Sequence, residues 1–135
     1  MVKADDPAML RAFAKANRTL DAFLIRLAAK DPTLTDPALK VKLVDGEAVE
    51  FFWVISPSAT AHGYSGTINN DPDLVKNVRN GQLISFSRSD IYDWTYHDPN
   101  SGKTFGNFTA CALLTHEPAA DAAEFRKTYG LDCDP

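Results

Sequence analysis

The sequence predicts an α+β fold, in which a curved antiparallel sheet of about five or six strands packs against an N-terminal and a C-terminal helix. Helical periodicity is confined to the two ends of the chain, over residues 7–30 and 118–130. Between them, short strand-like segments follow one another through turn-rich loops, without the crossover helices that parallel strands need. We therefore expect the strands to pair antiparallel and the helices to pack on one side of the sheet.

Length and charge limit the classes of function. The chain has 135 residues and a net charge of −4, which fits a single domain over residues 1–135. The nearest approach to a basic cluster, Lys76, Arg79 and Arg88, is too sparse to follow a phosphate backbone, so we do not expect nucleic-acid binding. No apolar run approaches the roughly 20 residues of a membrane span, so we expect no membrane insertion.

The N-terminal helix begins after Asp6, a residue type that caps helices, with Pro7 in the first turn. Apolar residues then recur at helical spacing, while most basic residues lie elsewhere, which is typical of a helix with one buried face. Asp31-Pro32 ends the helix, and residues 33–37 form a linker. The residues that share the periodic face are Leu10, Phe13, Ala14, Asn17, Leu20, Leu24, Leu27 and Ala28.

A hairpin over residues 39–55 turns at an Asp-Gly pair. A two-residue loop there would set polar residues opposite apolar ones, whereas a loop one residue longer pairs Leu43 with Val49 and Val41 with Phe51. Because burial fixes register more strongly than turn preference, the sequence predicts the longer loop. The second strand of this hairpin is apolar on both faces, so we expect it to be central and covered by a helix.

Turn residues separate the remaining elements. We expect a turn-rich loop at 56–63, a strand at 64–68, a helical turn at 73–79, a strand at 83–86, and a second hairpin formed by strands at 91–97 and 105–114. Pro118 opens the last helix, in which Ala122, Phe125 and Tyr129 share a face and Gly130 is the C-cap.

The stretch DIYDWTY is the richest in chemically active side chains. In a strand, Tyr92, Trp94 and Tyr96 share one face, and Asp93 and His97 share the other. Four residues of strand separate Asp93 from His97 by about 13 Å, too far for the direct hydrogen bond of a catalytic dyad. This pattern indicates a core or groove face, with no catalytic motif of its own.

The rest of the chain offers little chemistry. His62, His97 and His116 occur singly, without the spacing of a zinc site. The sequence contains no nucleophile elbow and no phosphate-binding loop. We therefore expect no catalytic residue, no metal site and no cofactor.

Two features bear on the compartment. Cys111 and Cys133 could meet if the last helix folds back, and a disulfide between them would stabilise the fold by about 3 kcal/mol, but buried free thiols are common too. The small residues near the start, within residues 2–6, resemble a sequence left after leader removal, although cytosolic proteins also begin this way.

The strings FFWV, YSGTINNDP, VRNGQLISF, IYDWTY and GNFTACALL, in this order and spacing, resemble the YegJ-like bacterial family, domain of unknown function 2314. The resemblance runs from the first helix to the final EFRK and LDCD, with longer or more polar loops after Ser56 and at 98–103. It implies a periplasmic setting and favours a Cys111–Cys133 disulfide. It implies no catalytic residue.

We expect a non-enzymatic periplasmic binding protein with a protein partner, in its specific form an inhibitor or immunity protein whose loop 56–64 or 98–103 occludes a cell-envelope-targeting toxin. One alternative is an envelope enzyme or a sugar or peptidoglycan binder with an aromatic-acidic pocket around Asp93 and Trp94. Another is a structural envelope domain without a discrete ligand. The candidate binding residues are His62, Tyr64, Asn70, Asp93, Trp94, Tyr96, Asp98 and Asn100.

Overall fold

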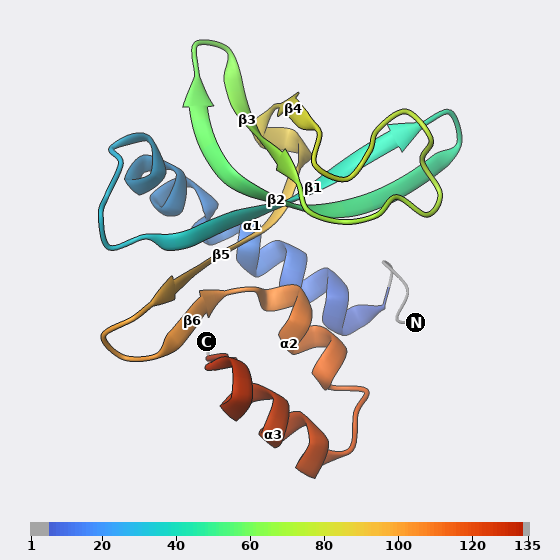
Figure 1. Cartoon of the computed structure of the whole chain (residues 1–135). Coiled ribbons are helices and arrows are strands. Elements are labelled where there is room, and N and C mark those ends of the chain that lie inside the picture. The colour runs from blue at the N-terminus through green and yellow to red at the C-terminus, as the bar shows by residue number, and fades with distance from the viewer. Residues whose placement is uncertain (1–5, 134–135) are drawn as a thin grey trace.

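The computed structural model describes residues 6–133 (Figure 1). Residues 1–5 and 134–135 lie outside the described part. Most of the stretch that resembles a cleaved leader junction, residues 2–6, therefore lies outside it as well. The elements in chain order are α1 (Pro7–Ala28), β1 (Thr35–Asp45), β2 (Ala48–Thr60), β3 (Gly63–Ile68), β4 (Leu83–Phe86), the 3-10 turn η1 (Arg88–Asp90), β5 (Ile91–Asp98), β6 (Lys103–Gly106), α2 (Phe108–Leu114) and α3 (Ala119–Tyr129).

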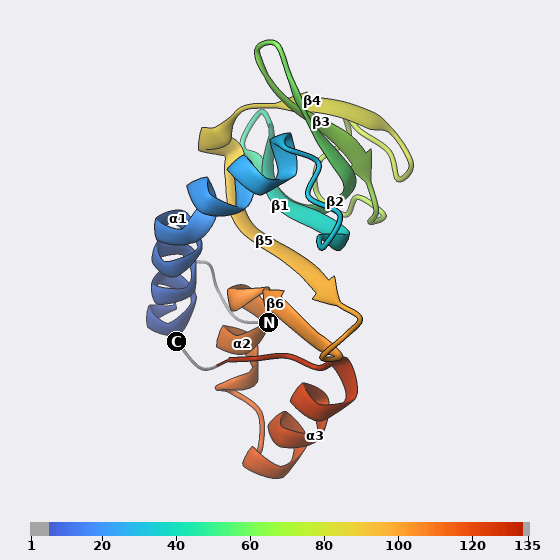
Figure 2. The same ribbon diagram turned by 90° about the vertical axis from the view of Figure 1, so that its left-hand side faces the viewer.

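The six strands form one open antiparallel sheet in the order β4-β3-β2-β1-β5-β6. The expected α+β class is confirmed, with helices at both ends of the chain, and β2 lies in the interior of the sheet between β1 and β3. In both views α2 and α3 gather beside β6, while the β2–β3 hairpin stands at the opposite end of the molecule (Figures 1 and 2).

Helix α1 begins as the sequence predicts. The Asp6 carboxylate accepts hydrogen bonds from the N–H groups of Ala8 and Met9, at 3.0 and 3.3 Å, and Pro7 occupies the first turn. Leu20, Leu24 and Leu27 are buried as predicted, but towards the N-terminus the buried stripe is rotated from the predicted one, so that Leu10 is 53% exposed. The buried residues of α1 are Met9, Ala12, Ala16, Leu20, Phe23, Leu24 and Leu27.

The predicted register of the first hairpin is wrong. Asp45 pairs with Ala48 across a two-residue turn, which pairs Val41 with Phe52 instead of Phe51. Because cross-strand partners share a face, this register places Val41 and Phe52 together in the main core, where both are fully buried. Burial does fix the register, but the residues of β2 that are fully buried in the core are Phe52 and Val54, whereas the prediction assumed the alternate residues, which include Phe51.

The predicted strand over 105–114 is also wrong. Strand β6 ends at Gly106, and Phe108 begins the helix α2. Gly106 and Asn107 have positive φ angles of 74° and 54°, which turn the chain out of the sheet. The sequence signal for this break is the Gly-Asn pair, a common turn former.

Three shorter segments differ from expectation. Strand β1 begins at Thr35, inside the predicted linker, and β2 continues to Thr60, inside the predicted loop. Residues 73–79 form bends without a helical turn. Backbone N–H groups in this segment bond to the Glu50 carboxylate instead, with Leu74 N–H at 2.7 Å, so a side chain from β2 satisfies them.

A β-bulge at Tyr92 changes which side chains of β5 share a face. Lys40 of β1 pairs with Asp93, but its neighbour Val41 pairs with Ile91, which leaves Tyr92 without a partner. Tyr92 packs against Phe51, the partner of Lys42, whereas Trp94 pairs with Leu39 on the opposite face of β1. The prediction that Tyr92 shares a face with Trp94 is therefore wrong.

Candidate functional site

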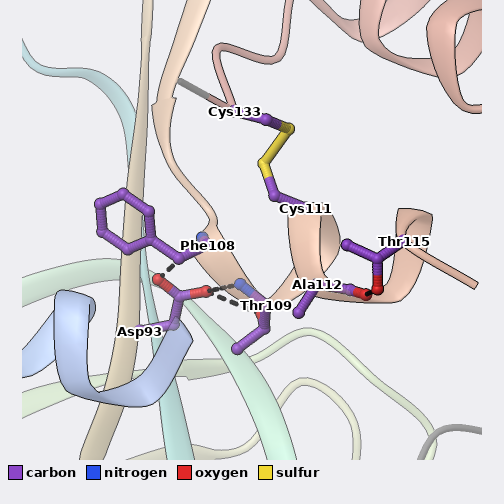
Figure 3. The surroundings of a disulfide bond; sticks show 7 residues. All are labelled: Asp93, Phe108, Thr109, Cys111, Ala112, Thr115 and Cys133. Carbon is purple, nitrogen blue, oxygen red and sulfur yellow. Dashed lines mark hydrogen bonds between the residues drawn. A yellow bond between two sulfur atoms is a disulfide. The ribbon is translucent and has the colours of Figure 1, made fainter. Parts of the chain in front are cut away.

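The Asp93 carboxylate connects the sheet to helix α2 (Figure 3). It accepts hydrogen bonds from the N–H groups of Trp94, Phe108 and Thr109, at 2.9, 3.3 and 2.9 Å, and from the Thr109 hydroxyl at 2.7 Å. Asp93 and Thr109 are both 0% exposed. Asp93 thus satisfies the first N–H groups of α2 from a distant strand, as an N-cap does locally.

Lys40 completes this buried network. Its ammonium group donates a 2.9 Å hydrogen bond to Thr109 Oγ1 and lies 5.4 Å from the centre of the Trp53 ring. Burial raises the pKa of Asp93, against the hydrogen bonds from Thr109 and the charge of Lys40. Burial lowers the pKa of Lys40, against the charge of Asp93. Lys40 has no signal in the sequence beyond its place in an alternating strand.

The aromatic side chains next to Asp93 pack against α1. The Trp94 ring stacks on Phe23 at 4.9 Å between centroids, and its Nε1 donates to Thr19 Oγ1 at 2.9 Å. The Tyr96 hydroxyl accepts from Arg26 at 3.1 Å. These contacts occupy the polar atoms of both aromatic rings within the fold.

The other predicted binding residues are spread over the molecule. His62 and Tyr64 lie in the β2–β3 hairpin, and Asn70 follows β3, where its side chain accepts from a backbone N–H of β2 at 2.8 Å. Asp98 ends β5 and Asn100 lies in the turn between β5 and β6, which projects away from the β2–β3 hairpin in Figure 1. The eight predicted residues therefore do not form one site.

A different surface gathers exposed aromatic side chains. Phe125 and Tyr129 of α3 are 40% and 59% exposed, and their ring centroids lie 4.6 Å apart. They share a helix face with Ala122, as predicted, but only Ala122 is buried.

A pocket lies on each side of Phe125. One has a volume of about 290 Å³ and the other about 260 Å³. We call Phe125, Tyr129 and the residues of both pockets the α3 surface; the remaining members are Ala110, Leu113, Leu114, Glu117 and Asp121 in the first pocket, and Asp36, Thr95, Tyr96, His97, Thr104, Asn107 and Leu131 in the second.

Three carboxylates belong to the α3 surface, namely those of Asp36, Glu117 and Asp121. Among the described residues that line the two pockets, none is a lysine or an arginine. The α3 surface therefore combines apolar and aromatic side chains with acidic groups, and of the predicted binding residues it contains Tyr96.

Helix α3 is held in place at its C-terminal end. Cys111 of α2 and Cys133 form a disulfide with their Cα atoms 5.5 Å apart (Figure 3), as the family resemblance favours. Thr104 of β6 donates its N–H to Gly130 O at 2.7 Å and its hydroxyl to Tyr129 O at 2.9 Å. These bonds tie the C-terminal end of α3 to the sheet and the segment after it to α2.

Within residues 6–133 no group of three or more His, Cys, Asp or Glu side chains is arranged to hold a metal ion. No helix in this part of the chain has the length and apolar content needed to cross a bilayer.

Comparison with known proteins places the chain in a family. The sequence profile described as "Uncharacterized protein conserved in bacteria (DUF2314)" matches residues 6–133. The chain is 32% identical over 122 residues to Uncharacterized protein YegJ of Escherichia coli (strain K12). The aligned region covers 90% of this chain and 77% of that relative. The chain is 27% identical over 88 residues to Putative ankyrin repeat protein NMB1133/NMB1171 of Neisseria meningitidis serogroup B, covering 65% of this chain and 34% of that relative. No solved structure matches. The chain belongs to the bacterial DUF2314 family.

Proposed function

We propose that the protein is a non-enzymatic, protein-binding domain of the bacterial cell envelope, and that the α3 surface contacts the partner. The observation that supports this most is the exposed pair Phe125 and Tyr129 with a pocket on either side. Aromatic side chains are enriched at the energetically dominant centres of protein interfaces. There they fill pockets on the partner, and side chains of the partner pack around them.

The charges of the α3 surface define the chemistry of the partner. Asp36 lines one pocket and Glu117 and Asp121 line the other, each together with apolar side chains, and the whole chain carries a net charge of −4. A partner segment with apolar side chains flanked by lysine or arginine complements this surface, and opposite charges accelerate association.

The way in which α3 is held favours a tight inhibitor. The Cys111–Cys133 disulfide and the bonds from Thr104 fix the α3 surface before a partner arrives, so that little conformational entropy is lost on binding. A small, rigid, acidic domain of this kind suits an immunity protein that covers the functional site of a basic toxin. The disulfide supports the cell envelope as the compartment, because disulfides persist outside the reducing cytosol.

One relative adds support for protein binding. The Neisseria meningitidis protein is named a putative ankyrin repeat protein, and the match covers only 34% of it. Ankyrin repeats stack into extended binding surfaces. A match to a protein of that name fits a role in protein recognition.

The alternative of an enzyme or sugar-binding site around Asp93 and Trp94 has weaker support. The Asp93 carboxylate accepts four hydrogen bonds from within the chain and is fully buried. A substrate would reach it only if α2 moved away from β5.

Photocrosslinking tests the proposal. The photoreactive residue p-benzoylphenylalanine replaces Phe125, His62 at the β2–β3 tip, or Ile25, an apolar and 70% exposed residue of α1, in the bacterium that makes the protein. We expect one discrete covalent adduct from position 125, its loss when Tyr129→Asp is added, and no such adduct from position 25. An adduct from position 62 alone would place the contact on the hairpin, and equal labelling from all three positions would contradict a specific surface.

A further inference from the structure

A second cleft, chemically unlike the α3 surface, lies between α1 and α2. Its volume is about 290 Å³. The Cys111–Cys133 disulfide forms part of its wall, and the apolar residues that line it are Ala8, Ala12, Phe108, Ala112 and Leu114. This volume is at the small end of the range for pockets that hold organic ligands.

Basic side chains from two helices converge on this cleft, although the chain as a whole is acidic. Arg11 and Lys15 come from α1, and Arg126 comes from α3. Among the lining residues that fall within positions 6–133, none is an aspartate or glutamate. Cations gathered around a concave, partly apolar surface produce a positive potential that favours an anion there.

The two arginines have guanidinium groups available for a ligand. Neither the Arg11 nor the Arg126 side chain forms a hydrogen bond or ion pair with another residue between positions 6 and 133. Lys15 is different, because its ammonium group lies 4.9 Å from the centre of the Phe108 ring. Arginine forms paired hydrogen bonds with carboxylate and phosphate groups, which suits it to recognise either.

Three links hold the walls of the cleft in position. Asp93 fixes the start of α2 to β5, and the disulfide joins α2 to the segment after α3. Asp6 Oδ1 at the start of α1 lies 3.2 Å from His116 Nε2, just after α2. Because these links already exist in the free protein, the cleft needs no large rearrangement to receive a ligand.

We propose that this cleft binds a small amphiphilic anion, with a carboxylate or phosphate group held by Arg11 and Arg126 and an apolar body against Ala12, Ala112 and Phe108. The inference does not depend on the α3 surface or on a protein partner. It adds a small-molecule site to a chain whose sequence offers no ligand-binding motif.

Amide chemical-shift titrations of the intact protein test the inference with four probes. Benzoate and phenyl phosphate have both a charged group and an apolar ring, benzamide lacks the charge, and inorganic phosphate lacks the ring. We expect saturable shifts in α1 and α2 for at least one of the first two, with affinity at least about tenfold above that of benzamide and inorganic phosphate. Comparison of benzoate with phenyl phosphate identifies the preferred charged group.

Three variants complete the test. Arg11→Gln and Arg126→Gln each lower the affinity about tenfold, whereas Arg18→Gln, which removes a charge from an exposed position of α1 outside the cleft, leaves it unchanged. Absence of saturable binding by both amphiphilic anions overturns the inference. So does equal binding of benzamide, equal binding of inorganic phosphate, or an equal loss in all three variants.

Discussion

Asp93 of β5 accepts two hydrogen bonds from Thr109 of α2, one from its N–H at 2.9 Å and one from its hydroxyl at 2.7 Å. Helix α2 has only seven residues, too few to be stable alone. The Asp93–Thr109 pair therefore gives a short apolar segment a helical start, and it positions the disulfide, the cleft between α1 and α2, and the segment that leads to α3.

Replacement of Asp93 tests this role. Asp93→Ala leaves the fully buried Thr109 N–H without its acceptor and the half-buried Lys40 without the nearby negative charge. We expect the free energy of unfolding to fall by about 3 kcal/mol, measured by urea denaturation. Thr109→Val, which removes only the hydroxyl, should cost less, about 1 to 2 kcal/mol. If both variants had the same free energy of unfolding as the native protein, the network around Asp93 would not contribute to stability.

Two glycines with similar backbone angles separate backbone strain from steric crowding. Gly106 has φ 74° and Gly102 has φ 73°, but only at Gly106 would a Cβ meet the carbonyl and ring of Trp94. We expect Gly102→Ala to lower the free energy of unfolding by about 1 kcal/mol and Gly106→Ala by about 3 kcal/mol. If denaturation gave the same loss of unfolding free energy for both variants, Gly106 would lie farther from Trp94 than in the structure.

Asp31 predicts a loss of stability in acid. The hydrogen bond from the Thr33 hydroxyl, followed by that from Arg26, lowers the pKa of Asp31 from 3.8 to about 2. Between these values the unfolded chain binds more protons at this residue than the folded chain does, so stability rises with pH there. The contribution is complete above pH 3.8 and disappears as the pH falls through about 2.

The variant Asp31→Asn isolates this contribution. Its free energy of unfolding should decline less steeply than that of the native sequence between pH 4 and pH 2, roughly the window set by the two pKa values. Asp93 acts with the opposite sign, since burial raises its pKa, so only the difference between the two proteins is informative. Parallel curves would contradict the Asp31 assignment.

The Cys111–Cys133 bond, with a sequence separation of 22, should stabilise the fold by about 3 kcal/mol. We expect the double variant Cys111→Ala with Cys133→Ala to lose this amount, and hydrogen exchange to quicken mainly in α3. The main core contains neither cysteine, so the sheet should keep its protection. A reductant should affect the native protein but not the variant; no effect on either would mean that the bond does not form.

The sequence predicts the elements whose signals are local. The Asp6 cap and the periodicity of α1 identify that helix, and turn residues around 64–68 and 83–86 identify β3 and β4. The family resemblance favours the disulfide that the structure contains. These features need no knowledge of distant contacts.

What the sequence does not predict depends on long-range contacts. FTACALL suits a buried strand as well as a helix, and the Asp93 carboxylate, 16 residues before Thr109, decides for the helix. Phe51 and Phe52 are alike in type, and the long-range packing of the main core determines that Phe52 is the fully buried one. The α3 surface escapes prediction because Phe125 has the periodicity of a core residue while no described element covers it.

The most direct test of the proposed function is the affinity of the partner captured at position 125, measured with purified proteins by calorimetry. We predict that Phe125→Asp weakens binding by at least about 30-fold, which corresponds to about 2 kcal/mol, without lowering thermal stability. The matched variant Ile25→Asp, at an exposed apolar position of α1, should bind like the native protein. Native affinity in Phe125→Asp would contradict the assignment of the α3 surface as the contact site.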